Sequence, residues 1–160
     1  MDDLQTVQKA EKEIDKLGLP IPNKPESAVE SLEWPENVAD LNPEELAQHM
    51  TWWSGWAAYA RHHLARAETN ATAFDKEKRL MESERIHKSQ GDYKNVTELK
   101  AAVAQMPDMQ AIEAKFLEAD AVKRMVKALL EGYETKYATI SREISRRGFG
   151  CKISRGWVEV

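Results

Sequence analysis

Two long runs of apolar residues, each repeating with alternating steps of three and four, constrain this chain more than any other feature of its 160 residues. This spacing places the apolar side chains on one stripe of an α-helix, and such a stripe is buried against another helix. The first run is Leu46, Met50, Trp53, Ala57, Ala60, Leu64, Ala67, Ala71, Phe74 and Met81, with Lys78 at one position. The second is Ile112, Phe116, Ala119, Val126, Leu130, Tyr133, Tyr137, Ile140 and Ile144, with Lys123 at one position. The sequence therefore predicts an all-α fold: two long antiparallel helices with coiled-coil-like seams.

The expected start of the first long helix is marked by three residues. Asn42 is a favoured N-cap residue, Pro43 suits the first helical position, and Glu45 completes a capping box. We expect this helix to continue to about Ser89, because Gly91 follows and glycine is common just beyond a helix end.

Similar signals place a short helix between the two long ones. Asn95 and Glu98 repeat the N-cap spacing, and Pro107 ends the short helix. Asp108 is expected to cap the second long helix. That helix is expected to end at Gly148, where two arginines lie near the negative helix end and an apolar residue follows the glycine.

Proline content separates the N-terminal region from the rest of the chain. A short amphipathic helix is expected to stop at Gly18, and residues 18–42 then contain four prolines among polar and acidic residues. Within this stretch Leu32 and Trp34 are candidates to dock on the helices. We therefore predict a flexible acidic N-terminal arm with a Pro-rich linker over 1–42, a helical body over 43–150 and a C-terminal tail over 151–160.

Charge is distributed unevenly along the chain. Residues 1–50 contain 12 acidic and 4 basic residues, a net charge of −8, whereas residues 51–160 contain 15 and 19, a net charge of +4. An acidic arm on a basic body indicates that the body meets an anion or that the arm meets a basic partner.

Several functional classes lack support in the sequence. The longest uncharged apolar run is far below the roughly 20 residues of a membrane span, and the acidic first residues do not resemble a signal peptide. A single cysteine, Cys151, favours a cytoplasmic protein and leaves no internal disulfide. No Gly-rich phosphate loop, catalytic motif or set of metal ligands is present, so we expect no enzyme activity, no cofactor and no metal.

A second aromatic stripe lies beside the first seam. Trp52, Trp56 and Tyr59 follow the same steps of four and three and continue to His63 and Arg66. Such a stripe is either core, a subunit contact or a stacking platform for unpaired bases. Because two seams and this stripe exceed what one hairpin can bury, we predict a homo-oligomer. The predicted interface residues are Trp52, Trp53, Trp56, Tyr59 and Leu64.

Basic residues gather at two places. At the far end of the first long helix they are Lys76, Lys78, Arg79, Arg85 and Lys88, interleaved with acids. Near the C-terminus they are Arg142, Arg146, Arg147, Lys152 and Arg155, with few acids between them. Either set is a solvated, salt-bridged surface or a site for nucleic-acid phosphates.

The layout resembles the UvsY-type phage recombination mediators. The resemblance covers about residues 43–151 and rests on the tryptophan-bearing helix (53–56), its basic distal half, Glu98-Leu99-Lys100 opening a short helix, and the ending Ser145-Arg146-Arg147-Gly148-Phe149. It implies a small helical protein that forms ring-like oligomers and binds single-stranded DNA. It also implies that the protein helps to load a RecA-type recombinase onto strands covered by single-strand-binding protein, with DNA contacts late in the first long helix.

The leading hypothesis is accordingly an oligomeric recombination mediator that binds single-stranded DNA in the host cytoplasm. Two alternatives stay open on the sequence. One is a helical virion or assembly component, such as a connector or scaffold, and the other is an adaptor whose acidic arm blocks or recruits a basic partner.

Overall fold

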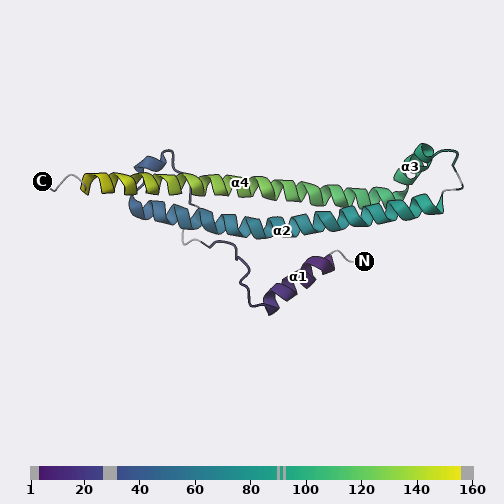
Figure 1. Cartoon of the computed structure of the whole chain (residues 1–160), viewed down its shortest axis with the longest axis horizontal. Helices are drawn as coiled ribbons and strands as arrows, with labels where there is room; N and C mark the ends of the chain where they lie inside the picture. The colour runs from purple at the N-terminus through teal and green to yellow at the C-terminus, as the bar shows by residue number, and fades with distance from the viewer. Residues whose placement is uncertain (1–3, 27–31, 90, 92, 156–160) are drawn as a thin grey trace. The chain divides into compact units, whose positions relative to one another are not determined.

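A computed structural model of the chain describes residues 4–26, 32–89, 91 and 93–155, with the backbone alone for 4–6 and 149–155. Its elements are α1 (Leu4–Lys16), a 3₁₀ turn η1 (Val38–Asp40), α2 (Pro43–Lys88), α3 (Val96–Ala104) and α4 (Pro107–Arg155) (Figure 1). The predicted all-α class, with a short helix between two long ones, is confirmed. Within the described residues, no helix is both long and apolar enough to cross a membrane.

The predicted starts of α2 and α3 are confirmed by their hydrogen bonds. The Asn42 side-chain oxygen accepts from the backbone N–H groups of Glu44 and Glu45, each at 2.9 Å, and the Glu45 carboxylate accepts from the Asn42 N–H at 2.8 Å. The Asn95 side chain accepts from the Glu98 N–H at 2.8 Å. These bonds satisfy amide groups that have no partner in the first helical turn.

Gly18 ends α1, as the sequence predicts. Its φ of +66° lies in the left-handed region, which glycine adopts without a steric penalty. The Gly18 N–H donates to the Asp15 carbonyl at 2.9 Å and the Leu19 N–H donates to the Ile14 carbonyl at 3.4 Å. This pair of bonds is the Schellman motif, which satisfies carbonyls of the last helical turn.

Two expectations about α4 are wrong. The helix begins at Pro107, so Asp108 lies inside the first turn, where its carboxylate accepts a bond from Arg85 Nε at 2.8 Å. The helix also continues through Gly148 to Arg155. Gly148 adopts no left-handed conformation, and glycine tolerates helical geometry at a cost of about 1 kcal/mol relative to alanine.

The chain divides into two compact units, each built from parts of both long helices. The first, called the α3 unit here, contains residues 1–20 and 63–126. The second, called the tryptophan unit, contains residues 21–62 and 127–160. Within each unit the α2 and α4 segments run antiparallel, as predicted. In the α3 unit Lys78 pairs with Glu113 and Arg85, later on α2, pairs with the earlier Asp108. In the tryptophan unit Arg61 pairs with Glu134, whereas Leu41, just before α2, meets the later Arg147.

The core of the α3 unit lies where α3 meets the ends of both long helices. Leu99, Val103, Met109 and Ile112 are buried together, and Phe74, Met81, Ile86 and Met106 pack against them. Along α2 the predicted seam positions Ala67 and Ala71 are also buried. The seam of this unit is thus confirmed, and α3 closes its end.

The core of the tryptophan unit follows the predicted seams as well. Its buried apolar residues are Leu46, Trp53, Ala57, Ala60, Leu130 and Ile140. Trp53 stacks on Tyr133, with ring centroids 5.9 Å apart and an interplanar angle of 25°. Large side chains of both helices thus pack against each other in this core.

The described parts of the N-terminal region lie against the long helices of their own units. Val7 of α1 is buried, and Glu11 pairs with Arg66 of α2 at 3.0 Å in the α3 unit. In the tryptophan unit, Trp34 contacts the rings of His49 and Trp53, so its predicted docking is confirmed. We call residues 32–41, which precede α2, the strap.

Replacing Ile140 tests the seam of the tryptophan unit. Ile140 is 0% exposed, so Ile140→Ala leaves a cavity and is expected to lower the free energy of unfolding by about 2–5 kcal/mol. Ile144→Ala is the matched control on the same helix, because Ile144 is 38% exposed, and about 1 kcal/mol or less is expected. Denaturant midpoints at unchanged slope measure both, and equal losses would contradict this seam.

Candidate nucleic-acid interface

The basic residues at the end of α2 are largely paired with carboxylates. Lys78 pairs with Glu113 of α4, and its ammonium also lies 5.3 Å from the centroid of the Phe116 ring. Arg85 binds Asp108 at the start of α4. These pairs join α2 to α4, so Lys78 and Arg85 stabilise the α3 unit.

The other basic residues at this end differ in their engagement. Arg79 pairs with Asp75 at 2.9 Å and Lys88 with Glu84 at 3.8 Å, both one turn apart on α2. Lys76 is exposed, and no ion pair with another described residue involves it. The set Lys76, Lys78, Arg79, Arg85 and Lys88 thus carries little net charge beyond its own carboxylates.

The basic residues on the last part of α4 are less neutralised. Arg142 is exposed and forms no ion pair with any residue that the structure describes. Arg146 makes two parallel bonds of 2.8 Å to the Glu143 carboxylate, yet its side chain stays 68% exposed. Arg142 and Arg146 are one turn apart, so they share one face of the helix.

Arg147 has a different position from its neighbours. Its Nε donates to Glu143 at 2.7 Å, and its two terminal nitrogens donate to the carbonyls of Leu41 at 2.7 Å and Ala39 at 2.8 Å. We call these contacts the Arg147 clamp. The half-buried guanidinium holds the end of the strap against α4, so Arg147 stabilises the tryptophan unit.

Lys152 and Arg155 complete the predicted set. Their backbone belongs to α4, and their side chains lie outside the described residues.

Glu143 is the acid that the two arginines share. Hydrogen bonds from Arg146 and then Arg147 lower the pKa of Glu143 from its usual value near 4.5 to about 2. The same carboxylate raises the pKa of Arg146. Both arginines and Glu143 are therefore charged at neutral pH, which leaves a net positive charge here.

The aromatic stripe on α2 makes contacts within the tryptophan unit. Trp56 meets Trp52 and Tyr59 edge to face, with centroids 5.8 and 5.9 Å away, and it also lies 5.8 Å from Tyr133 of α4. Trp53 is buried, whereas Trp52, Trp56 and Tyr59 are half-buried. Leu64, the remaining predicted interface residue, is half-buried in the α3 unit.

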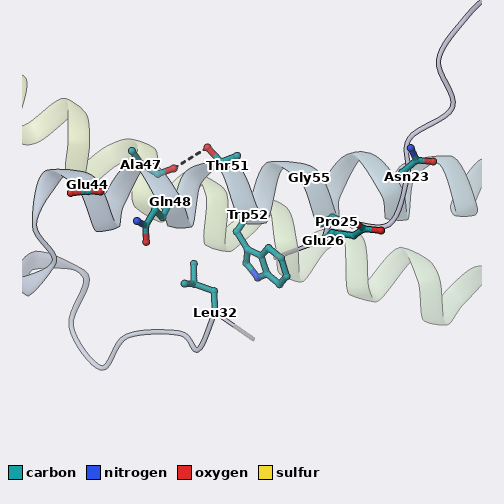
Figure 2. Close-up of a pocket in the computed structure, with 10 residues that line it drawn as sticks. All are labelled: Asn23, Pro25, Glu26, Leu32, Glu44, Ala47, Gln48, Thr51, Trp52 and Gly55. Atoms are coloured by element: carbon teal, nitrogen blue, oxygen red, sulfur yellow. Dashed lines mark hydrogen bonds between the residues drawn. The ribbon is translucent and has the colours of Figure 1, made fainter. Parts of the chain in front are cut away.

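A groove runs beside this stripe in the tryptophan unit. It has a volume of about 690 Å³ (Figure 2). Trp52 and Gly55 of α2 line one side, and Pro25 and Leu32, which precede α2 in the chain, line the other. Figure 2 shows Leu32 pointing toward α2 beside Trp52. A Cβ at Gly55 would lie 3.2 Å from Pro25 Cγ, so the close approach of Pro25 depends on glycine at this position.

The two rings that Trp34 contacts each carry a buried polar atom without a hydrogen-bond partner among the described residues. These atoms are Nδ1 of His49 and Nε1 of Trp53. Burial lowers the pKa of His49 although the nearby Glu45 carboxylate acts in the opposite direction, so the imidazole is neutral at pH 7. The ammonium of Lys136 lies 3.9 Å from the centroid of the Trp53 ring and 5.7 Å from that of Trp34.

The acidic partners of the basic residues are what sequence reasoning missed. Lys78 and Lys123 occupy positions in otherwise apolar seams, and a charge there needs an acidic partner nearby. The structure supplies Glu113 for Lys78 and the buried Asp120 for Lys123. A charged residue in an apolar seam thus predicts an acidic partner, whereas no feature of the sequence predicts the carbonyl partners of Arg147.

Comparison with protein-family models, with curated proteins and with solved structures finds no match to this chain. The resemblance to the UvsY-type mediators therefore rests on the sequence motifs alone. Among the described residues, no group of three or more His, Cys, Asp or Glu side chains is placed to hold a metal ion.

The shared carboxylate of Glu143 predicts a pH dependence. Its pKa of about 2 lies below the usual value, so its contribution to stability is present above pH 4.5 and is lost as the pH falls toward 2. Glu143→Gln is expected to lower stability at pH 7 and to flatten the stability profile between pH 4.5 and 2. Glu131→Gln, an exposed carboxylate on α4, is the control. Identical acid-unfolding profiles for Glu143→Gln and the unmodified chain would contradict the assignment.

Proposed function

We propose that this chain is an oligomeric single-stranded-DNA-binding protein, a recombination mediator that assists the loading of a RecA-type recombinase. The observation that carries DNA binding is the exposed pair Arg142 and Arg146 on one face of α4. Residues 142–155 contain five basic residues and one acid, so this end of the helix has a cationic surplus. The mediator role is what the sequence resemblance implies.

The basic side chains favour contacts with phosphates over base edges. They are Arg and Lys without the Asn or Gln that often reads adenine, so binding is expected to tolerate any sequence. Single strands covered by single-strand-binding protein in the host cytoplasm are the proposed substrate, and a RecA-type recombinase is the proposed partner. The proposal assigns the chain no catalytic step, cofactor or metal.

The two predicted basic sets differ in how well they fit this role. At the end of α2, binding phosphates requires ion pairs such as Lys78–Glu113 and Arg85–Asp108 to break, which would weaken the α3 unit. On α4, Arg142 forms no ion pair with a residue that the structure describes, and Arg146 is largely exposed. The α4 set is therefore the proposed primary contact, and Lys76 is the member of the α2 set best placed to add to it.

Self-association is proposed through the outer face of α4 in the α3 unit. Leu117, Val122 and Met125 are 57%, 48% and 69% exposed, which is unusual for large apolar side chains close together on one helix. Ala114 and Ala121, both exposed and seven residues apart, lie on the same side as Leu117 and Met125 and let an identical helix approach closely. Because the same face on a second copy is equally apolar, a two-fold pairing would bury both.

The same apolar face favours a second candidate function. A helical virion or assembly component needs surfaces that bind protein, and Leu117, Val122 and Met125 supply one without reference to DNA. Salt-dependent binding of unpaired DNA distinguishes the two candidates.

DNA binding is tested by Arg142→Ala/Arg146→Ala in the full chain. The double variant is expected to bind single strands of any sequence more weakly, because two phosphate contacts are lost. The slope of log affinity against log salt concentration should shrink by about 1.4, or about 0.7 per contact. Titrations of a labelled oligonucleotide at several salt concentrations measure both quantities.

The matched control is Lys9→Ala/Lys12→Ala, which removes two exposed cations from α1. It should leave affinity and slope unchanged. If the arginine variant also leaves both unchanged, the DNA contact belongs to the Lys76–Lys88 segment instead. Absence of binding by the unmodified chain at low salt would favour the assembly candidate.

The oligomer interface is tested by Leu117→Glu/Met125→Glu. Charges on this face should disperse the assembly to monomers, because each copy would meet the same charges on its partner. Lys127→Glu is the control and should keep the oligomer, because Lys127 is exposed on α4 but two residues after Met125 and so on another side of the helix. Light scattering measures the mass. Retention of the full mass by the double variant would contradict this interface. It would favour the interface predicted from the sequence, which consists of Trp52, Trp53, Trp56, Tyr59 and Leu64.

A further inference from the structure

Trp34 of the strap covers two buried rings of α2. Its ring meets His49 edge to face at 6.3 Å and Trp53 at 6.1 Å with an interplanar angle of 64°. His49 and Trp53 are only 6% and 7% exposed, whereas Trp34 itself is 37% exposed. The cover is thus open to solvent while the surface beneath it is buried.

The cover leaves hydrogen-bonding capacity unused. Nδ1 of His49 and Nε1 of Trp53, which have no hydrogen-bond partner within the described part of the chain, belong to the two rings that Trp34 contacts. Buried polar atoms are almost always paired, and each unpaired one is costly. An indole has a single N–H and no acceptor atom. Trp34 therefore covers this surface but cannot offer a hydrogen-bond acceptor to the N–H of Trp53.

The surroundings of these rings suit a planar ligand with an anionic group. Trp53 also contacts Tyr133 of α4, which stacks on it with ring centroids 5.9 Å apart. The Lys136 ammonium lies beside both indoles, 3.9 Å from the Trp53 centroid and 5.7 Å from the Trp34 centroid. Arg142 follows Lys136 by six residues on α4, about 9 Å along the helix axis.

Trp34 is able to leave without release of the whole strap. The Arg147 clamp holds the strap at the carbonyls of Ala39 and Leu41, five and seven residues after Trp34. Asn37 caps η1 between them, through a bond of 3.1 Å from the Ala39 N–H. Rotation of the chain before Asn37 therefore uncovers His49 and Trp53 while the clamp stays closed.

We propose that the surface beneath Trp34 is a binding site for one unpaired nucleobase of a DNA strand, and that Trp34 occupies it as the chain's own substitute for the base. This inference rests on the proposed single-stranded-DNA binding. A base is a flat aromatic ring that can take the edge-to-face position of Trp34 against His49 and Trp53, and unlike an indole it carries several donors and acceptors at its edge. Those edge groups pair with His49 and Trp53, while Lys136 faces the phosphate.

The test compares two strands that differ only in their bases. Oligothymidylate and an abasic phosphodiester strand of equal length are titrated into the full chain and into Trp34→Ala, at one salt concentration. Removal of the Trp34 side chain should tighten oligothymidylate binding up to roughly tenfold, the size expected from the aromatic contacts of one base. Binding of the abasic strand should stay unchanged, because phosphate contacts are not altered.

Two further variants make the result specific. Leu32→Ala changes the strap without removing an aromatic cover and should behave as the unmodified chain. Trp34→Ala/His49→Phe keeps an aromatic ring at 49 but removes its polar atom, and should lose part of the gain. Thermal unfolding checks that each variant is folded. If Trp34→Ala fails to fold, Trp34→Leu takes its place in the titrations, because leucine removes the aromatic ring but keeps an apolar side chain at this position.

Each outcome separates the inference from the proposed function. An equal gain for both strands means that Trp34 only obstructs phosphates, which overturns the base site and keeps DNA binding. Unchanged oligothymidylate affinity in Trp34→Ala, with salt-dependent binding retained, also overturns the base site alone. Failure of the unmodified chain and of Trp34→Ala to bind either strand at low salt overturns both.

Discussion

The seam of small residues on α2 is the constraint on which the rest of the structure depends. Ala57 and Ala60 are buried in the tryptophan unit, and Ala67 and Ala71 in the α3 unit. Short side chains allow a neighbouring helix to approach closely, and the buried seam residues of α4, Ile112, Leu130 and Ile140, are larger. A long helix with a polar outer surface derives its stability mainly from such packing. The ion pairs, the aromatic cluster and the strap all build on helices that this seam holds together.

Packing of the helices also decides which cations are free to act. Lys78 and Lys123 lie in seam positions and must be paired, because burial of an uncompensated charge is unfavourable. Glu113 and Asp120 serve them, and Asp120 also holds Arg124 at 2.6 Å. Toward the end of α4 acids become scarce, and one carboxylate, Glu143, is shared by two arginines. The difference between the two basic sets therefore follows from where helix packing demands neutralisation.

The sequence predicts those features of the fold that depend on neighbours in the chain. The seams, the Asn42 cap and the stop at Gly18 are periodic or local, and all are confirmed. Asp108 is of a residue type that often caps helices, but α4 begins one residue earlier, at Pro107, and the Asp108 carboxylate accepts a bond from Arg85. The residues around Gly148 are typical of a helix C-terminus, yet α4 continues to Arg155. A glycine within a helix costs only about 1 kcal/mol relative to alanine, which does not have to end the helix.

The candidate site was less predictable than the fold for the same physical reason. Which basic residues exist is visible in the sequence, but which of them are free depends on contacts between distant segments. Arg147 and Leu41 are 106 residues apart, and no spacing rule joins them. Trp34 is a docking candidate by its hydrophobicity, whereas the buried ring nitrogens of His49 and Trp53, without a partner among the described residues, are evident only in the structure.

The long separation of the Arg147 clamp has a consequence for how the chain folds. Arg85 and Asp108 are 23 residues apart, whereas Arg147 and Leu41 are 106 apart. Closing the longer loop from an open chain costs about 1.4 kcal/mol more entropy, so contacts near α3 form first and pairing of α2 with α4 proceeds from there. The clamp is then among the last contacts to form. We therefore expect hydrogen exchange to be faster in the strap than in the helices that it covers.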